Sequence, residues 1–202
     1  IVFGDWSSDV CSSDLPWTIA DRRLPTAQPI LETLLGLLDL PAWRLTASEV
    51  FGLLELPAVS GRFGVDAQGL ERIRTWIAQT QIRWGADSAM RAAEGLPDEA
   101  ANTWKAGLGR LFLGYAMAPE EIFFAETLSC PEVEGAAAAD LGALQTLVDR
   151  LTQWRTALCR PVAAGAWLER VNRLVADFLA PDDEEAERSE ERRVGKECRS
   201  RW

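Results

Sequence analysis

The chain contains 202 residues, of which 48% are hydrophobic, and its formal net charge is −10 at pH 7. This length suits one domain, and the apolar content is sufficient for a substantial core. No apolar run approaches the ~20 residues that a membrane helix requires, and no secretory leader opens the chain, so we expect no membrane span. The acidic charge is opposite in sign to that of most free nucleic-acid-binding domains. Charge alone therefore favours a scaffold or an interaction module.

Metal-binding residue types are scarce in this chain. Histidine is absent, and the four cysteines, at positions 11, 130, 159 and 198, form no CxxC pair. A zinc site of Cys and His ligands needs such closely spaced donors, so this class of metal centre is excluded. We interpret the cysteines as reduced thiols of a cytosolic protein.

The two ends of the chain differ in character from the part between them. Residues 188–202, RSEERRVGKECRSRW, show neither apolar periodicity nor a turn pattern, and the string is an acceptable translation of a common sequencing adapter. Residues 4–15 resemble the translation of the opposite adapter. We therefore expect residues 1–15 and 188–202 to be adapter artefacts around a natural segment at 16–187. The alternative is a flexible natural tail at each end.

Prolines define the first predicted elements of this segment. Residues 16–20 alternate in polarity and predict a short strand, which a proline-containing loop follows. Pro29 suits the first turn of a helix that Pro41 ends. The apolar face of this helix comprises Ile30, Leu31, Leu34, Leu35, Leu37 and Leu38.

Capping residues mark the next helices. Thr46 and Glu49 form a capping box at the start of a second helix. Pro57 begins a short turn or helix that ends near residues 61–64, and Asp66 is the predicted N-cap of a third helix. The side chains expected to be buried in the second helix are Val50, Leu53 and Leu54, and the apolar stripe of the third helix comprises Leu70, Ile73, Trp76 and Ile77.

The middle of the chain gives a more mixed pattern. A helical turn is expected at 89–93, before a break at Gly95 and Pro97. Asn102 is the predicted N-cap of a longer helix, and a further helix or turn is predicted at 120–128. The apolar face of the longer helix comprises Trp104, Leu108, Leu111, Phe112 and Tyr115.

Two long helices are predicted near the end of the segment. Their apolar side chains recur at spacings of three and four, and the short turn at Arg160 and Pro161 predicts antiparallel packing. The two apolar stripes are Leu141, Leu144, Leu147, Val148, Leu151, Trp154 and Leu158, and then Trp167, Val171, Leu174, Val175, Phe178 and Leu179. The acidic run at 182–187 is interpreted as solvated rather than as a metal site. The predicted fold is mainly α, an irregular helical bundle with a short N-terminal strand.

Catalytic patterns are missing from the segment. Lys105 is the only lysine between residues 16 and 187, and no glycine-rich phosphate loop precedes it. Gly107 and Gly109 are interpreted as sites of close helix packing. Cys130 and Cys159 have no histidine to activate them. We therefore expect no catalytic, cofactor-binding or metal-binding residue in this chain.

Tryptophans next to basic residues are the remaining candidates for binding. Aromatic and basic side chains in alternation can stack on the bases and contact the phosphates of single-stranded DNA. Trp76, Trp104, Trp154 and Trp167 lie on apolar stripes and are expected in the core, whereas Trp84 lies on no clear stripe.

Two blocks carry a resemblance to a known family. Residues 82–85, IRWG, precede residues 102–117, NTWKAGLGRLFLGYAM. This arrangement resembles the gamma subunit of exodeoxyribonuclease V, RecC, of the RecBCD helicase–nuclease. Residues 15–23, 48–76 and 167–182 agree as well. Ala106 departs from the bulkier residue expected there, and residues 122–134 match weakly.

The resemblance implies an internal segment of an inactivated helicase-like domain in a bacterial cytoplasmic complex. That complex would act in double-strand break repair by homologous recombination and in degradation of linear DNA. The implied partners are a helicase–nuclease (beta) subunit and a helicase (alpha) subunit, which would use ATP and Mg²⁺, with DNA bound through the assembled complex. Arg83, Trp84, Lys105 and Arg110 are the candidate nucleic-acid contacts. Two alternatives remain, namely a generic helical protein-interaction domain without a DNA role and an enzyme whose site no pattern reveals.

Overall fold

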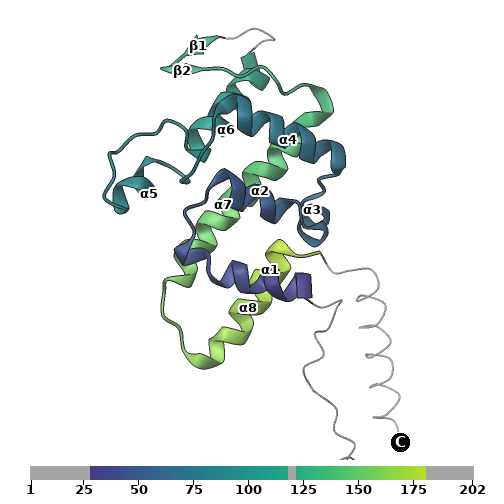
Figure 1. The fold of residues 1–202 in the computed structure, drawn as a ribbon, viewed down its shortest axis with the longest axis vertical. Coiled ribbons are helices and arrows are strands. Elements are labelled where there is room, and N and C mark those ends of the chain that lie inside the picture. Colours follow the sequence, from purple (N-terminus) through teal and green to yellow (C-terminus); the bar gives the residue numbers. More distant parts are fainter. Residues whose placement is uncertain (1–27, 118–121, 181–202) are drawn as a thin grey trace, which may run out of the picture.

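The computed structural model describes residues 28–117 and 122–180 and confirms the mainly α-helical fold (Figure 1). The predicted strand at 16–20, the two ends interpreted as adapter artefacts and the acidic run at 182–187 lie outside the described residues. Among the described residues, no helix combines the length and the apolar character that crossing a bilayer would require.

The first helix is confirmed, but its buried face is narrower than predicted. Helix α1 spans Gln28–Leu38, and the 3-10 helix η2, Leu40–Ala42, follows it directly. Leu37 and Leu40 are fully buried, whereas Leu31 and Leu35 are more than half exposed. Only part of the predicted apolar face of this helix is therefore buried within the described chain.

Local capping sets the next three helices as predicted. In α2, Ala47–Leu54, the Glu49 backbone N–H donates to Thr46 Oγ1 at 3.1 Å, and the Thr46 N–H donates to Glu49 Oε2 at 2.7 Å. Helix α3, Pro57–Phe63, ends at Gly64, whose φ of 68° is left-handed. Helix α4, Ala67–Thr80, begins where Asp66 Oδ1 accepts from the Gly69 N–H at 2.7 Å.

Helices α5, Ser88–Ala93, and α6, Trp104–Met117, confirm the predicted pair but not the predicted cap. Asn102 has a left-handed φ of 61°, and its carbonyl accepts from the Arg83 N–H. Thr103 Oγ1 instead accepts from the Ala106 N–H at 3.2 Å and serves as the cap. Of the predicted apolar face, Trp104, Leu108 and Leu111 are buried, whereas Phe112 and Tyr115 are 40% and 51% exposed.

A small β-hairpin occupies the region where a helix or turn was predicted. Strands β1, Phe123–Phe124, and β2, Thr127–Leu128, pair antiparallel. Ala125 and Glu126 connect them with φ values of 47° and 63°. Two successive left-handed residues produce the twist of a two-residue hairpin turn, so the turn is confirmed and the helix is not.

Helix α7, Ala138–Leu158, runs along the body of the molecule after the 3-10 helix η3, Gly135–Ala137, and contacts α3, α4, α6 and η2 (Figure 1). Helix α8, Ala164–Phe178, returns beside it. Trp154 Nε1 donates to Asp177 Oδ2 at 2.8 Å, and Arg170 donates to the Ala157 carbonyl, which confirms the antiparallel packing. Trp167 is 41% exposed, so its predicted place in the core is wrong.

Candidate nucleic-acid interface

The IRWG block, residues 82–85, lies between two other segments and hydrogen-bonds to both. On one side, the Ala47 N–H donates to the Arg83 carbonyl at 2.8 Å, and the Gly85 N–H donates to the Arg44 carbonyl at 3.0 Å. On the other side, the Arg83 N–H donates to the Asn102 carbonyl and the Trp104 N–H to the Gly85 carbonyl. The two blocks of the resemblance therefore meet in space, next to the start of α2.

Trp104 stabilises the contact between the two blocks from within the core. Its side chain is fully buried, and its Nε1–H donates to the Leu45 carbonyl at 2.8 Å. Ile82, from the neighbouring block, is also buried and packs on α6 at Gly107. Backbone hydrogen bonds and the packing of the Ile82 side chain together therefore hold residues 82–86 in place.

Trp84 is half-buried, and two guanidinium groups lie over its ring. The Arg44 Cζ atom is 5.1 Å from the ring centroid, and the Arg91 Cζ atom is 4.7 Å from it. Contacts of this kind contribute about 0.5–2 kcal/mol each, more when water is excluded. The ring of Trp84 is therefore already engaged within the chain.

Arg91 is 8% exposed and uses its guanidinium to close the loop that follows α5. Its Nη2 donates to the Trp84 carbonyl at 2.9 Å, and its Nη1 donates to the Ala101 carbonyl at 2.7 Å. Backbone carbonyls thus accept from both terminal nitrogens of a buried cation that has no carboxylate partner among the described residues, while its Nε is buried without a hydrogen bond. Arg91 holds the α5 segment against the IRWG block.

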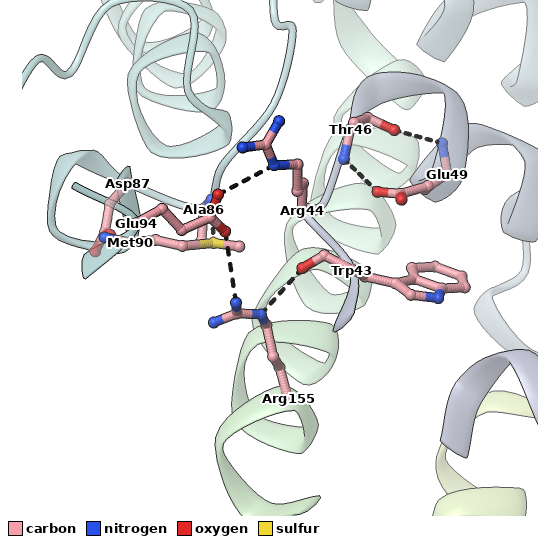
Figure 2. Close-up of polar contacts among 9 residues, drawn as sticks. All are labelled: Trp43, Arg44, Thr46, Glu49, Ala86, Asp87, Met90, Glu94 and Arg155. Atoms are coloured by element: carbon pink, nitrogen blue, oxygen red, sulfur yellow. Dashed lines mark hydrogen bonds and ion pairs between the residues drawn. The ribbon is translucent and has the colours of Figure 1, made fainter. Parts of the chain in front are cut away.

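A second link joins the same segment to α7 (Figure 2). Glu94 Oε2 accepts from Arg44 Nε at 3.0 Å, and Glu94 Oε1 lies 3.8 Å from an Arg155 Nη2. Arg155 Nε also donates to the Trp43 carbonyl at 3.1 Å. One carboxylate therefore bridges two arginines that come from distant parts of the chain.

The predicted contacts Arg83 and Lys105 are both exposed and lie in this neighbourhood. The Lys105 N–H donates to the Ala86 carbonyl, which places Lys105 beside the IRWG block. Within the described part of the chain, neither side chain forms a hydrogen bond or an ion pair. Both cations therefore remain available to a ligand that approaches this face.

Arg110, the fourth predicted contact, faces the β-hairpin instead. Its Nε donates to the Leu128 carbonyl at 2.9 Å, and its Nη1 donates to the Thr80 carbonyl at 3.4 Å. The structure therefore brings Arg83, Trp84 and Lys105 together and gives Arg110 a bridging position between α4 and β2.

A groove of about 310 Å³ opens between α6 and α7 next to Lys105. Phe112, Asp87 and Asp149 also line it. Lys105 is the single cation that lines this groove, alongside the two carboxylates. Among the described residues, moreover, no cluster of three or more His, Cys, Asp or Glu could hold a metal ion.

The arginines around Trp84 and Glu94 were not predicted as a group from the sequence. Arg44, Arg91 and Arg155 lie far apart in the chain, on a loop, a short helix and a long helix. Only the tertiary fold brings them to one tryptophan and one glutamate. Arg44 and Arg155 each follow a tryptophan in the sequence, but no spacing signal indicates that these arginines meet.

Comparison with known proteins gives one consistent family. The model of the fourth domain of the RecBCD enzyme subunit RecC matches residues 27–200. RecC of Escherichia coli (strain K12) is 34% identical over 183 residues, which cover 91% of this chain. RecC of Haemophilus influenzae is 27% identical over 183 residues, again 91% of the chain. RecC of Mycobacterium tuberculosis (strain CDC 1551) is 32% identical over 152 residues, or 75% of the chain.

The chain spans only a small part of these relatives, between 14% and 16% of their length. The family match reaches residue 200 and so includes part of the C-terminal run that was interpreted as an adapter. The adapter origin of the two ends stays a prediction.

Proposed function

We propose that this chain is a non-catalytic structural and DNA-guiding segment of a RecC subunit, because it belongs to the family of the fourth domain of the RecBCD enzyme subunit RecC. The observation that carries this proposal is the family match over residues 27–200, on a fold that is mainly helical. The subunit would act in double-strand break repair by homologous recombination and in degradation of linear DNA.

The partners follow from the same membership. The segment would work inside a bacterial cytoplasmic complex with a helicase–nuclease subunit and a second helicase subunit. ATP and Mg²⁺ would be used by those partners, and DNA would reach this segment through the assembled complex.

The geometry supports different roles for the four candidate contacts. Arg83 and Lys105 are exposed and have no described side-chain partner, so we assign them to the phosphates of a single strand. Arg44 and Arg91 lie over the ring of Trp84, so we assign Trp84 to positioning these two arginines. Arg110 donates to the Leu128 carbonyl, so we assign it to positioning the hairpin.

The test is a double substitution, Arg83→Ala with Lys105→Ala, in a full-length RecC subunit that carries this chain as its fourth domain. Binding of the assembled complex to single-stranded oligothymidylate is measured against salt concentration by fluorescence anisotropy. Each lost phosphate contact lowers the slope of log K against log salt by about 0.7, so the double variant is expected to lose about 1.4.

Arg160→Ala is the control, because Arg160 is an exposed arginine at the turn between α7 and α8 and is not one of the candidate contacts. It should leave the salt slope unchanged. Equal slopes for the wild-type complex and the double variant would contradict the DNA contact and favour a protein-interaction role without DNA.

A further inference from the structure

Arg44 and Arg155 converge on one carboxylate, that of Glu94, which lies just after α5 (Figure 2). Arg44 belongs to the loop before α2 and Arg155 to α7. Their two guanidinium groups reach opposite oxygens of the carboxylate, Oε2 and Oε1. The two arginines thus form an anion-binding site whose anion is the Glu94 carboxylate of the same chain.

Each arginine has an anchor that does not involve Glu94. The Arg44 guanidinium lies over the ring of Trp84, and Arg155 Nε donates to the Trp43 carbonyl at 3.1 Å. Removing the carboxylate would leave both cations in place and lacking their anion. Arginines held in this way lose little freedom when they take up a new oxyanion.

The segment that carries Glu94 is also held by other contacts. Arg91 ties it to the carbonyls of Trp84 and Ala101, and Asp87 Oδ1 caps α5 by accepting from the Met90 N–H at 2.9 Å. The Glu94 side chain can therefore turn away while α5 keeps its position. Solvent reaches the pair, since the Arg44 side chain is 59% exposed and that of Glu94 is 23% exposed.

We propose that Arg44 and Arg155 form a phosphate-binding site for a single strand of DNA and that Glu94 occupies this site until a backbone phosphate displaces it. A phosphodiester offers the same single negative charge and paired oxygen acceptors as the carboxylate, which suits a guanidinium pair. Glu94 thus acts as an internal competitor that weakens binding. This inference rests on the proposed DNA-guiding function and adds a further site to it.

The decisive variant is Glu94→Gln, tested in the full-length subunit within the assembled complex, with oligothymidylate as the probe. Loss of the competing charge is expected to tighten binding about two- to fivefold, the range that corresponds to a surface ion pair. The gain should disappear when Arg44→Gln and Arg155→Gln are added to it.

Glu55→Gln is the matched control. Glu55 pairs with Arg74 at 2.9 Å, so this variant also breaks an exposed ion pair and changes the net charge equally, but outside the Arg44 and Arg155 pair. Tightening by Glu94→Gln and not by Glu55→Gln supports the proposal. Equal affinities of the two variants, or weaker binding by Glu94→Gln, overturn it.

A measurement on the wild-type complex covers the case in which Glu94→Gln fails to fold. Modification by an arginine-specific dicarbonyl is followed by mass spectrometry with and without oligothymidylate. Arg44 should be protected severalfold by the strand, whereas Arg74, with a similar side-chain exposure of 57%, should not. Equal reactivity of Arg44 with and without the strand overturns the proposal.

The two proposals can fail separately. If Arg83→Ala with Lys105→Ala reduces the salt slope while Glu94→Gln binds like the wild type, only the competitor site is lost. If neither change alters binding and Arg44 is not protected, both the DNA-guiding function and the competitor site are overturned.

Discussion

Leu45 is a fully buried leucine in a left-handed backbone conformation, with a φ of 53°. A residue with a Cβ atom is strained there, at a cost of about 1–3 kcal/mol, and persists only where its surroundings hold it. The surroundings are the indole N–H of Trp104, bonded to the Leu45 carbonyl, and the neighbouring bonds of Arg44 and Ala47 to the IRWG block. The strain is thus located where three chain segments meet.

Trp104→Phe tests this single bond. The substitution keeps an aromatic ring but leaves the Leu45 carbonyl without its buried donor, so the free energy of unfolding should fall by about 2–3 kcal/mol. Urea unfolding followed by circular dichroism measures the loss. Trp167→Phe, at a position that is 41% exposed, should change stability by no more than about 0.5 kcal/mol. Similar losses for the two variants would refute the role of Trp104.

At single residues, the sequence predicts helix caps correctly where the capping bond joins residues that are close together in the chain. The capping box of Thr46 and Glu49 and the cap at Asp66 are confirmed, because each bond spans three residues. Asn102 was wrong because its backbone is recruited by Arg83, 19 positions earlier, and the adjacent Thr103 caps α6 instead. A hydrogen-bond partner this far away in the chain gives no signal in the sequence around Asn102.

Helix α6 shows how differently three glycines of one element are used. A methyl group at Gly107 would overlap the side chain of Ile82, and one at Gly114 would overlap the backbone of Cys130. At Gly109 a methyl group would meet nothing within 4 Å. Close packing, predicted for Gly107 and Gly109 alike, is therefore confirmed for the first and wrong for the second.

Gly114→Ala and Gly109→Ala should shift stability in opposite directions. The first forces the segment after β2 away from α6, at a cost of about 1–3 kcal/mol. The second replaces glycine in an open helix position and should add up to about 1 kcal/mol. Thermal unfolding of both variants compares them directly. A stabilising Gly114→Ala would show that the Cys130 backbone yields without cost.

The β-hairpin is the element that the sequence could not predict. Each strand has only two residues, too few for alternation to register, and the turn uses Ala125 and Glu126 rather than Asn or Gly. Its position depends on tertiary bonds, since Arg110 donates to the Leu128 carbonyl and the Cys130 N–H donates to the Arg110 carbonyl.

Helix α3 and the last part of the described chain pack against each other. Phe63 of α3 and Phe178 of α8 lie 6.3 Å apart between ring centroids. The Ala180 N–H donates to the Ala58 carbonyl at 2.8 Å, and Arg62 Nε donates to the Ala176 carbonyl at 2.9 Å. Helix α8 is therefore part of the core of the whole molecule.

Phe178→Ala tests this packing. Phe178 is fully buried, so its truncation should lower the free energy of unfolding by about 3–5 kcal/mol. If the molecule unfolds as one unit, circular dichroism and tryptophan fluorescence should report the same shifted urea midpoint. Leu168→Ala, at a side chain 72% exposed, is the control and should leave the midpoint in place. An unshifted midpoint for Phe178→Ala would mean that α8 contributes nothing to the core.

For the whole molecule, periodicity predicted the helices and their antiparallel final pair, but not the candidate site. Arg83, Trp84 and Lys105 were found through blocks that are contiguous in the sequence. Arg44, Glu94 and Arg155 come from three separate elements, and only the packing of α7 beside the loop before α2 unites them. Such convergence is a property of the fold and has no counterpart in local spacing.

The bond from Trp104 to Leu45 spans 59 positions of the chain, which matters while the polypeptide is being made. Synthesis proceeds from the N-terminus, so helices α1 to α4 leave the ribosome before Trp104 is available to them. Until then, Leu45 has no indole donor and the IRWG backbone lacks its bonds to residues 102–105. The nascent chain therefore passes through a stage in which its early segments lack the hydrogen bonds that later fix their mutual positions.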